Sequence, residues 1–389
     1  MTHPAVEQVM AEALALREQQ QRQRSLQVLQ PVSAREVHDG TRHYLNFSSN
    51  DYLGLSHHAQ VLGAFQQARL TGSRGSPLVT GYTDAHHYLA AQLAELLGRE
   101  KVVLFSSAFA ANHGVLATVG KFYRQLWLDR LAHASLLQGA QQRNIRWRRF
   151  AHQKFHLCAD AITQTEAPQL LVTESVFSMD GDALDTNGLQ HMLDQHPQLD
   201  AMIDDAHGFG VMGAHGLSIA EQFEQRDVGI LSLAFGKACG VAGGAIATDA
   251  NLAEFLINFC PEYIYSTAMP PAQAAAISAA VKVIVSAEGH QLRQRLSENV
   301  ALFRSLCRQL GLPVRGGEQA IQTLIVGEDA HALQLSDELR QQGCWCSAIR
   351  PPTVPDGMAR LRITLTAMHQ RQDIAALVNA LARAWQESL

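Results

Sequence analysis

The chain has 389 residues, 47% of them hydrophobic, and a formal net charge of −5 at pH 7. This length is enough for two domains, or for one large domain with a smaller one appended. No stripe of Lys and Arg interleaved with aromatic residues points to nucleic acid, and no apolar run approaches the roughly 18 residues that span a bilayer.

The N-terminal stretch from Val6 to Leu29 is rich in Gln, Arg and Glu and has no apolar h-region, so it does not resemble a signal peptide. We expect an amphipathic helix over residues 5–29, within a helical arm over residues 1–45. The six cysteines are scattered, and Cys344 and Cys346 are too close in sequence for a zinc pair. We therefore expect no metal site and a reducing, cytoplasmic location.

Two polar loops follow the arm. A short strand-like run, Tyr44 to Phe47, leads into S-S-N-D-Y-L-G-L over residues 48–55, where Asn50 and Asp51 favour a turn. This segment is either a plain turn or a group of donors for a ligand. The second loop, G-S-R-G-S-P-L-V-T-G over residues 72–81, is too polar for a core.

From residue 101 the pattern alternates between strands and helices, which predicts a mainly parallel sheet with helices on both faces. The expected strands cover residues 102–105, 126–128, 170–176, 201–204, 230–235 and 245–247. Ligands of such sheets bind at the carboxyl ends of the strands. The polar residues at or just after these ends are Ser106, Ser178, Asp204, His207 and Lys237.

One of these ends is followed by S-S-A-F-A-A-N-H, residues 106–113, which opens a helix. Free backbone N–H groups at a helix N-terminus bind anions, and phosphate is the usual guest. A serine that only caps the helix explains the same residues equally well.

The segment I-L-S-L-A-F-G-K-A-C-G-V-A-G-G, residues 230–244, places Lys237 after a buried strand and among small residues. Desolvation lowers the pKa of a lysine and makes its amine available for Schiff-base chemistry. Glycines allow a flat ligand to approach the backbone. A surface lysine in a glycine-rich turn is the alternative, so the choice depends on the other groups of a pyridoxal phosphate (PLP) site.

Those other groups are present. PLP acts as an electron sink when its ring nitrogen stays protonated, which a buried carboxylate enforces, and Asp204 at a strand end suits this role. His207 could hydrogen-bond the ring hydroxyl and His133 could lie on the ring face, although a single histidine is more often structural.

A dinucleotide-binding motif is the competing interpretation. Gly208-Phe-Gly210-Val-Met-Gly213 follows a strand with the G-x-G-x-x-G spacing of an NAD-dependent dehydrogenase. Against it, no convincing helix opens on Gly213, and no acidic residue ends a following strand to bind a ribose.

The remainder predicts a small α+β domain. A helical region runs from about residue 272 to 310, and the later strands are expected at 322–326, 345–349 and 360–365. Arg360 and Arg362 alternate on the last of these strands, so both should point to one face. We expect a large PLP-binding domain over residues 46–285 and a small one over residues 286–389.

Taken together, these segments resemble the fold-type I PLP enzymes, and among them the α-oxoamine synthases. The resemblance runs from about Tyr44 to the C-terminus. It rests on N-F-S-S-N-D-Y-L-G-L, T-E-S-V-F-S-M-D-G-D, D-D-A-H-G, F-G-K, Y-S-T-A-M-P-P-A and R-L-R-I-T-L-T, which occur in the family's order and spacing.

The resemblance implies a role for each matching residue. Lys237 would hold PLP, Asp204 would pair with the ring nitrogen, and His133 would stack on the ring. The other implied cofactor contacts are His207 and Ser178 near the ring oxygen, Ser107, Ala108 and Phe109 at the phosphate, and Ser266 or Thr267 from a second subunit of a homodimer. The implied substrate contacts are Asn50 and Arg362 at the amino-acid carboxylate, with Arg350 and Thr353 in the rigid A-I-R-P-P-T-V-P segment.

The implied reaction is the decarboxylative condensation of an amino acid with an acyl thioester. A-I-R-P-P-T-V-P and G-C-W-C-S-A-I-R favour L-alanine and a pimeloyl thioester, carried by coenzyme A or acyl carrier protein, over members of the family that use glycine. Three positions depart from the family. It usually has Thr at Ala234 and Gly at Ala108, and it commonly reads G-G-S-R where this chain has Arg74-Gly-Ser-Pro77.

Overall fold

The computed structural model describes residues 2–387 and divides into two compact units. The large unit comprises residues 50–178 and 182–295, and the small unit comprises residues 2–49, 179–181 and 296–387. The boundary differs from the expected one in that the N-terminal segment groups with the C-terminal part of the chain. The boundary between the large and the small unit lies between residues 295 and 296, inside helix α11 (Ala287–Gln309), ten residues after the expected position.

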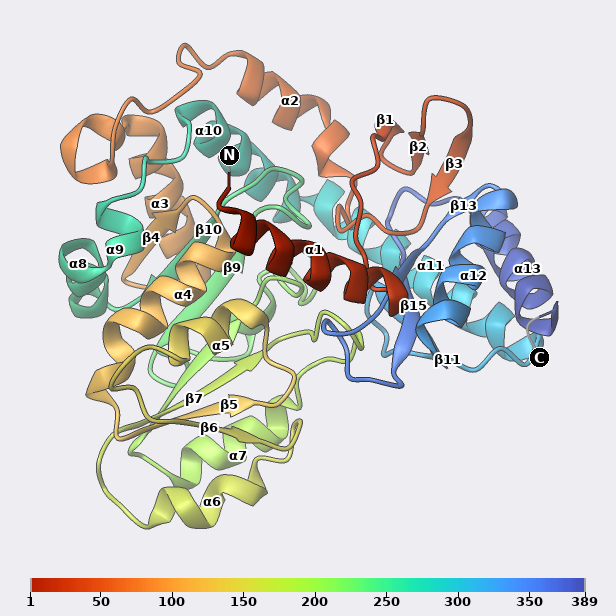
Figure 1. Cartoon of the computed structure of the whole chain (residues 1–389). Helices are drawn as coiled ribbons and strands as arrows, with labels where there is room; N and C mark the ends of the chain where they lie inside the picture. Colours follow the sequence, from red (N-terminus) through yellow and green to blue (C-terminus); the bar gives the residue numbers. More distant parts are fainter. Residues whose placement is uncertain (1, 388–389) are drawn as a thin grey trace. The chain divides into compact units, whose positions relative to one another are not determined.

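A seven-stranded sheet forms the centre of the large unit (Figure 1). In spatial order its strands are β4 (Lys101–Phe105), β10 (Gly244–Thr248), β9 (Ile230–Ala234), β8 (Leu199–Asp204), β7 (Gln169–Glu174), β5 (Gln125–Asp129) and β6 (Trp147–Phe150). Only β10 runs against its neighbours; all other pairings in the sheet are parallel. The predicted fold class, a mainly parallel sheet flanked by helices, is confirmed.

The central strands form because their mainly apolar residues are buried on both faces of the sheet. Every residue of β7 is buried, as is every residue of β9 and β10. Burying both faces of a parallel sheet requires such continuous apolar runs. The edge strand β6 was not predicted from the sequence. It carries Arg148 and Arg149 exposed to solvent, and charges on an edge strand prevent pairing with another chain.

Helices surround this sheet. α4 packs against β9, β10 and α5, and α3 packs against β4 and α10. The helices of the large unit are α2 (Ala59–Gln66), α3 (Asp84–Leu97), α4 (Ala108–Val119), α5 (Ala134–Ala140), α6 (His156–Thr163), α7 (Thr186–Gln195), α8 (Ala250–Phe259), α9 (Pro261–Ile264) and α10 (Pro271–Ile284). Short turns of helix are η1 (Leu55–His57), η2 (Pro77–Gly81), η3 (Gly120–Phe122) and η4 (Ser218–Glu221).

The helical region predicted from residue 272 to 310 is two helices rather than one. α10 ends at Ile284 and α11 begins at Ala287. Between them, the hydroxyl of Ser286 donates to the carbonyl of Val283 and accepts from the backbone N–H of Gly289. A serine that satisfies backbone groups at both helix ends explains the break.

The small unit contains two four-stranded sheets. One has the order β1 (Gln30–Ser33), β2 (Glu36–His38), β3 (His43–Asn46) and β13 (Cys344–Trp345), and the other has the order β11 (Val314–Arg315), β12 (Ile321–Gly327), β15 (Ala359–Thr364) and β14 (Ser347–Ile349). Its further helices are α1 (Pro4–Gln19), α12 (Asp329–Gln341) and α13 (Arg371–Glu387). The single strand predicted over residues 345–349 is wrong, because Cys346 separates β13 from β14 and the two strands join different sheets.

The N-terminal helix ends earlier than predicted. α1 stops at Gln19, and Gln21 adopts a positive φ of 56°, which no helix continues through. The guanidinium of Arg22 then forms ion pairs with Asp329 and Asp356, which tie the segment after α1 to the C-terminal part of the small unit.

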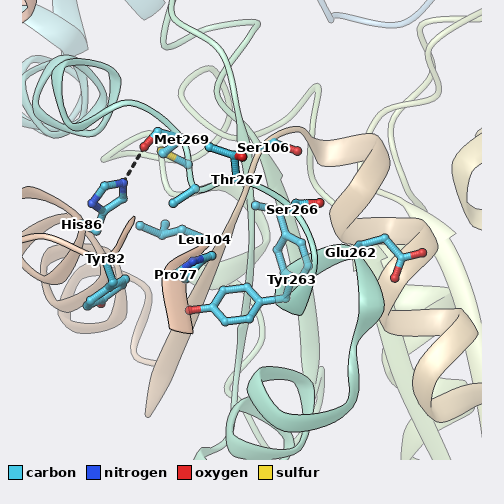
Figure 2. A pocket seen from close by; sticks show the side chains of 12 residues that line it. Pro77, Tyr82, His86, Leu104, Ser106, Glu262, Tyr263, Ser266, Thr267 and Met269 are labelled. Atoms are coloured by element: carbon cyan, nitrogen blue, oxygen red, sulfur yellow. Dashed lines mark hydrogen bonds between the residues drawn. The ribbon is translucent and has the colours of Figure 1, made fainter. Parts of the chain in front are cut away.

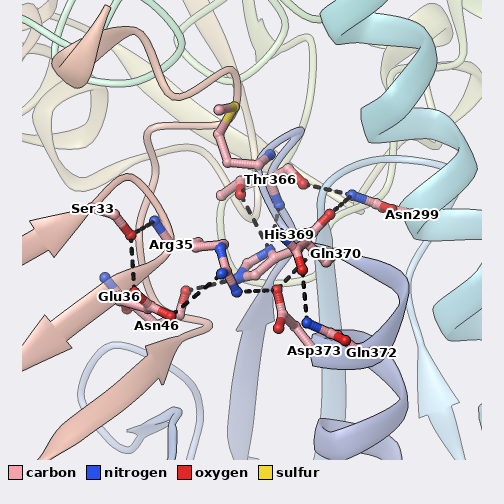
Figure 3. Close-up of polar contacts among 11 residues, drawn as sticks. Ser33, Arg35, Glu36, Asn46, Asn299, Thr366, His369, Gln370, Gln372 and Asp373 are labelled. Atoms are coloured by element: carbon pink, nitrogen blue, oxygen red, sulfur yellow. Dashed lines mark hydrogen bonds and ion pairs between the residues drawn. The ribbon is translucent and has the colours of Figure 1, made fainter.

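Polar contacts join the N-terminal strands to the C-terminal part of the small unit (Figure 3). Arg35 forms an ion pair with Asp373 over 2.6 Å, and Nε2 of His369 lies 3.2 Å from the carbonyl oxygen of Asn46. The strands β3 and β13 pair in parallel, with Leu45 opposite Cys344. These contacts explain why residues 2–49 belong to the small unit rather than forming a separate arm.

Within residues 2–387, no helix combines the length and the hydropathy that crossing a membrane requires. All six cysteines are buried and unpaired.

Candidate active site

Two of the predicted site residues stand at neighbouring strand ends of the large sheet. Asp204 is the last residue of β8, and Lys237 lies in the turn that joins β9 to β10. β8 and β9 pair in parallel, with Asp204 opposite Ser232. Asp204 is buried, and Lys237 is half-buried. The topology therefore places an acidic and a basic group at the carboxyl ends of two neighbouring strands, as the strand pattern predicts.

The carboxylate of Asp204 is held by amide donors. Nδ2 of Asn112, on α4, donates to Oδ2 over 2.6 Å, and the backbone N–H of Ala206 donates to Oδ1 over 3.0 Å. The same Nδ2 lies 3.0 Å from the hydroxyl of Ser135 on α5. Amide donors stabilise the ionised form of a carboxyl group and fix its orientation.

His133 caps the N-terminus of α5 in the same region. Its Nδ1 lies 2.8 Å from the hydroxyl of Ser135 and accepts from the backbone N–H of that residue. The ring meets Phe109 edge to face, with centroids 6.3 Å apart. Burial lowers the pKa of His133, the charge of Asp204 opposes this, and the charge of Lys237 adds to it. The three residues thus share one electrostatic environment.

His207 lies just beyond Asp204 and contacts a tyrosine. Its Nδ1 is 2.5 Å from the hydroxyl of Tyr52, whose side chain is buried. The same hydroxyl donates to Oδ1 of Asn50 over 3.3 Å. The polar turn at residues 48–55 thus supplies side chains to this strand edge, which distinguishes it from a plain turn.

The backbone packs closely around the lysine turn. Gly240 has a φ of 66°, and a Cβ there would lie 2.2 Å from the backbone nitrogen of Ser56. Ser56 is itself held by Asp51, whose Oδ2 accepts from both its hydroxyl and its N–H. Only glycine fits this contact, so the small residues that follow Lys237 are explained by packing as well as by ligand access.

The N-terminus of α4 lies beside this turn. Ser107 is the N-cap, and its Oγ accepts from the N–H of Ala110 over 3.1 Å. A Cβ at Gly244 would lie 2.4 Å from the nitrogen of Ala108. Ala108 and Phe109 are the first residues of the helix, where backbone N–H groups have no partner within the helix. The cap and the anion site, which the sequence offered as alternatives, are therefore compatible.

Ser266 and Thr267 line a pocket that also contains Ser106 (Figure 2). The backbone around them is held from outside the segment. Nε2 of His86 lies 2.8 Å from the carbonyl of Met269, and the hydroxyl of Ser73 donates to the carbonyl of Ala268 over 2.6 Å. The polar loop at residues 72–81 thus positions the segment that carries the two hydroxyls.

The remaining predicted residues are distributed over both units. Ser178 lies in a turn of the large unit, and Arg350, Thr353 and Arg362 lie in the small unit. Arg362 is buried on β15 and donates from Nη1 to the hydroxyl of Thr364 over 3.1 Å.

Arg360, two residues earlier on the same strand, has different hydrogen-bond partners from Arg362. Nη1 of Arg360 donates to Oδ1 of Asp180 over 2.6 Å and to the carbonyl of Met179 over 3.0 Å. In the A-I-R-P-P-T-V-P segment, Arg350 donates to the carbonyl of Gln21, and the hydroxyl of Thr353 accepts from Arg24 over 3.0 Å.

Sequence reasoning missed three buried polar residues of this region: Asn112, Ser135 and Glu174. Asn112 could have been noticed as a polar residue on the buried face of a mainly apolar helix. Glu174 ends β7 and stands opposite Asp204 in the sheet register. The motif T-E-S-V-F-S-M-D-G-D contains Glu174 but does not by itself mark it as an ionisable group at a strand end.

The dehydrogenase alternative does not fit the structure. The segment 207–216 after β8 is a series of turns, and no helix begins at Gly213. The next helical element is η4, which has four residues. A dinucleotide site needs a helix N-terminus directed at the pyrophosphate, and a helix of this kind does not follow the motif.

Comparisons with known proteins agree with this geometry. Residues 42–381 match the family described as aminotransferase class I and II. The chain is 46% identical over 376 residues to an 8-amino-7-oxononanoate synthase of Pectobacterium atrosepticum, covering 96% of this chain and 97% of that protein.

Two solved structures share the fold. A variant of serine palmitoyltransferase from S. paucimobilis with a bound PLP–myriocin aldimine superposes with a TM-score of 0.90 at 22% identity, covering 97% of this chain and 98% of that one. An 8-amino-7-oxononanoate synthase from Francisella tularensis gives a TM-score of 0.75 at 26% identity, covering 88% and 98%.

Proposed function

Because the chain belongs to the aminotransferase class I and II family, we propose that it is a PLP-dependent acyltransferase of biotin biosynthesis. It condenses L-alanine with a pimeloyl thioester and releases 8-amino-7-oxononanoate, CO2 and the free carrier thiol. The identity of 46% along 96% of the chain to a protein named for this product is the observation that supports the choice of reaction.

The residues of the large unit fit the cofactor. A buried carboxylate held by two amide donors suits a protonated ring nitrogen, and the N-terminus of α4 suits a phosphate. Gly244 approaches Ala108 so closely that a side chain at this position would clash with the start of that helix. Bound PLP supplies an electron sink for the negative charge left when a bond at the amino acid's α-carbon breaks.

We assign roles to the chain's own groups as follows. Nζ of Lys237 would hold the cofactor, and the same amine would accept the α-proton of alanine. Asp204 would lie beside the ring nitrogen and accept a hydrogen bond from the proton there. His133 would lie against the ring, and burial, which lowers the pKa of its side chain, favours its uncharged form. The hydroxyl of Tyr52 orients His207 toward the ring oxygen, where Ser178 also contributes.

Substrate binding is assigned to Asn50 and Arg362 at the alanine carboxylate, since a planar guanidinium matches that group in a bidentate manner. Arg350 and Thr353 are assigned to the pimeloyl substrate. The working unit we propose is a homodimer in the cytoplasm, in which Ser266 or Thr267 reaches the phosphate of the partner. The six free cysteines support a reducing compartment.

The proposal is tested by incubating the purified protein with L-alanine and either pimeloyl-CoA or pimeloyl-acyl carrier protein, and detecting the product by mass spectrometry. Turnover should disappear in Lys237→Ala, while far-UV circular dichroism stays unchanged. Lys282→Ala is the matched control, because Lys282 is an exposed lysine of α10 that stacks on Tyr88. Faster turnover with glycine than with alanine would reject the assigned substrate, and a dimer interface is tested separately by sedimentation.

A further inference from the structure

The carboxyl groups of Glu174 and Asp204 occupy equivalent positions at the carboxyl ends of two neighbouring strands of the large sheet. Glu174 is the last residue of β7 and Asp204 the last residue of β8, and the two stand opposite each other in the parallel register. Neighbouring strands lie roughly 4.8 Å apart, and residues in register point to the same face. Glu174 is 2% exposed and Asp204 is 4% exposed.

Two ionised carboxylates this close and this buried would be costly, because each needs charge or hydrogen-bond partners that only water otherwise provides. The hydrogen-bond donors are unequally divided between the two carboxyl groups. Asp204 accepts from Asn112 and from the N–H of Ala206. Oε1 of Glu174 is buried and finds no hydrogen-bond partner within residues 2–387.

The charged and titratable groups around Glu174 come from four elements. Asp204 on β8 and Asp129 on β5 disfavour a second negative charge, while Lys237 after β9 favours it. His133, before α5, offers its backbone N–H to the Glu174 carboxyl group and carries a side chain whose pKa is itself lowered. The acidic neighbours and burial outweigh the single lysine, which the proposed function in any case commits to the cofactor.

We propose that Glu174 is a positioning residue that stays protonated in the folded enzyme, so that the negative charge of the pair rests on Asp204 alone. This inference rests on the proposed function only in assigning Asp204 to the ring nitrogen. A neutral Glu174 leaves one charge at that nitrogen rather than two and keeps Lys237 from forming an ion pair with a second carboxylate. Burial, followed by the charge of Asp204, raises the pKa of Glu174 well above its usual range, which agrees with the geometry.

The direct test is the infrared spectrum of the PLP-loaded enzyme at pH 7, as a difference between wild type and Glu174→Gln. The expected difference is the loss of a carbonyl stretch from a protonated carboxylic acid, with no loss in the carboxylate region. Glu254→Gln is the matched control, since Glu254 is exposed on α8 and its removal should subtract a carboxylate band. Loss of a carboxylate band in Glu174→Gln would overturn the proposal.

A second readout separates neutrality from simple packing. Glu174→Gln keeps the shape of the neutral acid, so PLP should bind at least tenfold more tightly to this variant than to Glu174→Ala, measured by titration of the apo proteins. A Gln variant that binds no better than the Ala variant would show that a negative charge is needed, and the proposal would be abandoned.

If Glu174→Gln does not fold, wild-type enzyme labelled with carboxyl-13C glutamate answers the same question. One resonance should keep the position of a protonated carboxyl group at pH 7, and its absence would contradict the proposal. None of these measurements requires substrate. An enzyme that shows the protonated group but makes no product would therefore reject the proposed reaction and leave the assignment of Glu174 intact.

Discussion

Nδ2 of Asn112 donates a 2.6 Å hydrogen bond to Oδ2 of Asp204, and both side chains are buried. A hydrogen bond to a charged group contributes roughly 1.5–3 kcal/mol. Asn112→Leu keeps a similar volume but removes the donor, so Asp204 should hold a ring nitrogen less well. We expect PLP affinity to fall by about tenfold to a hundredfold, measured by titration of the apo protein.

Asn299→Leu is the control for this experiment. Asn299 is also buried, and it donates to the carbonyls of Thr366 and His369 in the small unit. Its loss should lower the free energy of unfolding without changing the PLP dissociation constant. Equal losses of PLP affinity in the two variants would mean that Asn112 acts through general stability.

Gly244 should not tolerate a side chain. The Cβ of an alanine there would lie 2.4 Å from the nitrogen and 2.5 Å from the Cα of Ala108, so the start of α4 would have to move. Gly244→Ala should weaken phosphate binding at that helix end by tenfold or more, as measured by PLP titration. Gly63→Ala is the control, because a Cβ on α2 meets nothing within 4 Å. A Gly244→Ala variant with wild-type affinity would separate the phosphate from α4.

Ala234 ends β9 opposite Gly244, and the family resemblance implies a threonine at this position. The nearest hydroxyl on the same strand face, Ser232, is buried two residues back, about 6.6 Å along the strand. Ala234→Thr should therefore tighten PLP binding, by as much as about tenfold to a hundredfold if a full charge-assisted bond forms.

The comparison needs Ala234→Val, which adds the same volume without the hydroxyl. Crowding in a packed strand would weaken both variants, whereas a phosphate contact would strengthen only the threonine variant. If threonine binds PLP no better than alanine, the phosphate is already satisfied by other donors.

Arg362 is predicted to bind the carboxylate of alanine. Arg362→Ala should raise the KM for alanine by about tenfold to a hundredfold, as expected for the loss of hydrogen bonds between charged groups, and leave PLP bound. Arg315→Ala, which removes an exposed arginine of β11 in the same unit, should leave the KM unchanged. An unaltered KM in Arg362→Ala would transfer the role to Arg350.

His152 should make stability depend on pH. Burial lowers its pKa, but hydrogen bonds to Asp129 over 2.9 Å and Asp182 over 2.7 Å outweigh this and raise it to about 9. Because the folded pKa is raised, the contribution is complete below pH 6.5 and is lost as the pH rises through about 9.

We therefore expect His152→Asn to lower the free energy of unfolding by about 1–2 kcal/mol at pH 6, allowing for partial exposure of the ring. The difference from wild type should shrink when denaturant titrations are repeated above pH 9. His290→Asn, at an exposed position of α11, is the control. A deficit that stays constant from pH 6 to 10 would show that the His152 ring stabilises by packing on Phe177 rather than by charge.

The sequence alone determined six of the seven strands of the large sheet, the edge strand β6 excepted, and the polar residues at their carboxyl ends. Continuous apolar runs such as 230–234 can only be buried, and parallel topology brings their ends to one edge. Asp204, His207 and Lys237 could therefore be placed together without coordinates. The turn that contains Lys237 could also be predicted, because a glycine such as Gly240 indicates a position where the backbone packs too closely for a side chain.

The tertiary structure decided what depends on distant pairings. Whether residues 344–349 form one strand or two is set by β3 and β15, which pair with the two halves from opposite ends of the chain's sequence. Asn112 and Glu174 became site residues only when α4 packed on the sheet and β7 came into register with β8. Periodicity reports which face of an element is buried, whereas the partner of a buried polar group is a property of the packed fold.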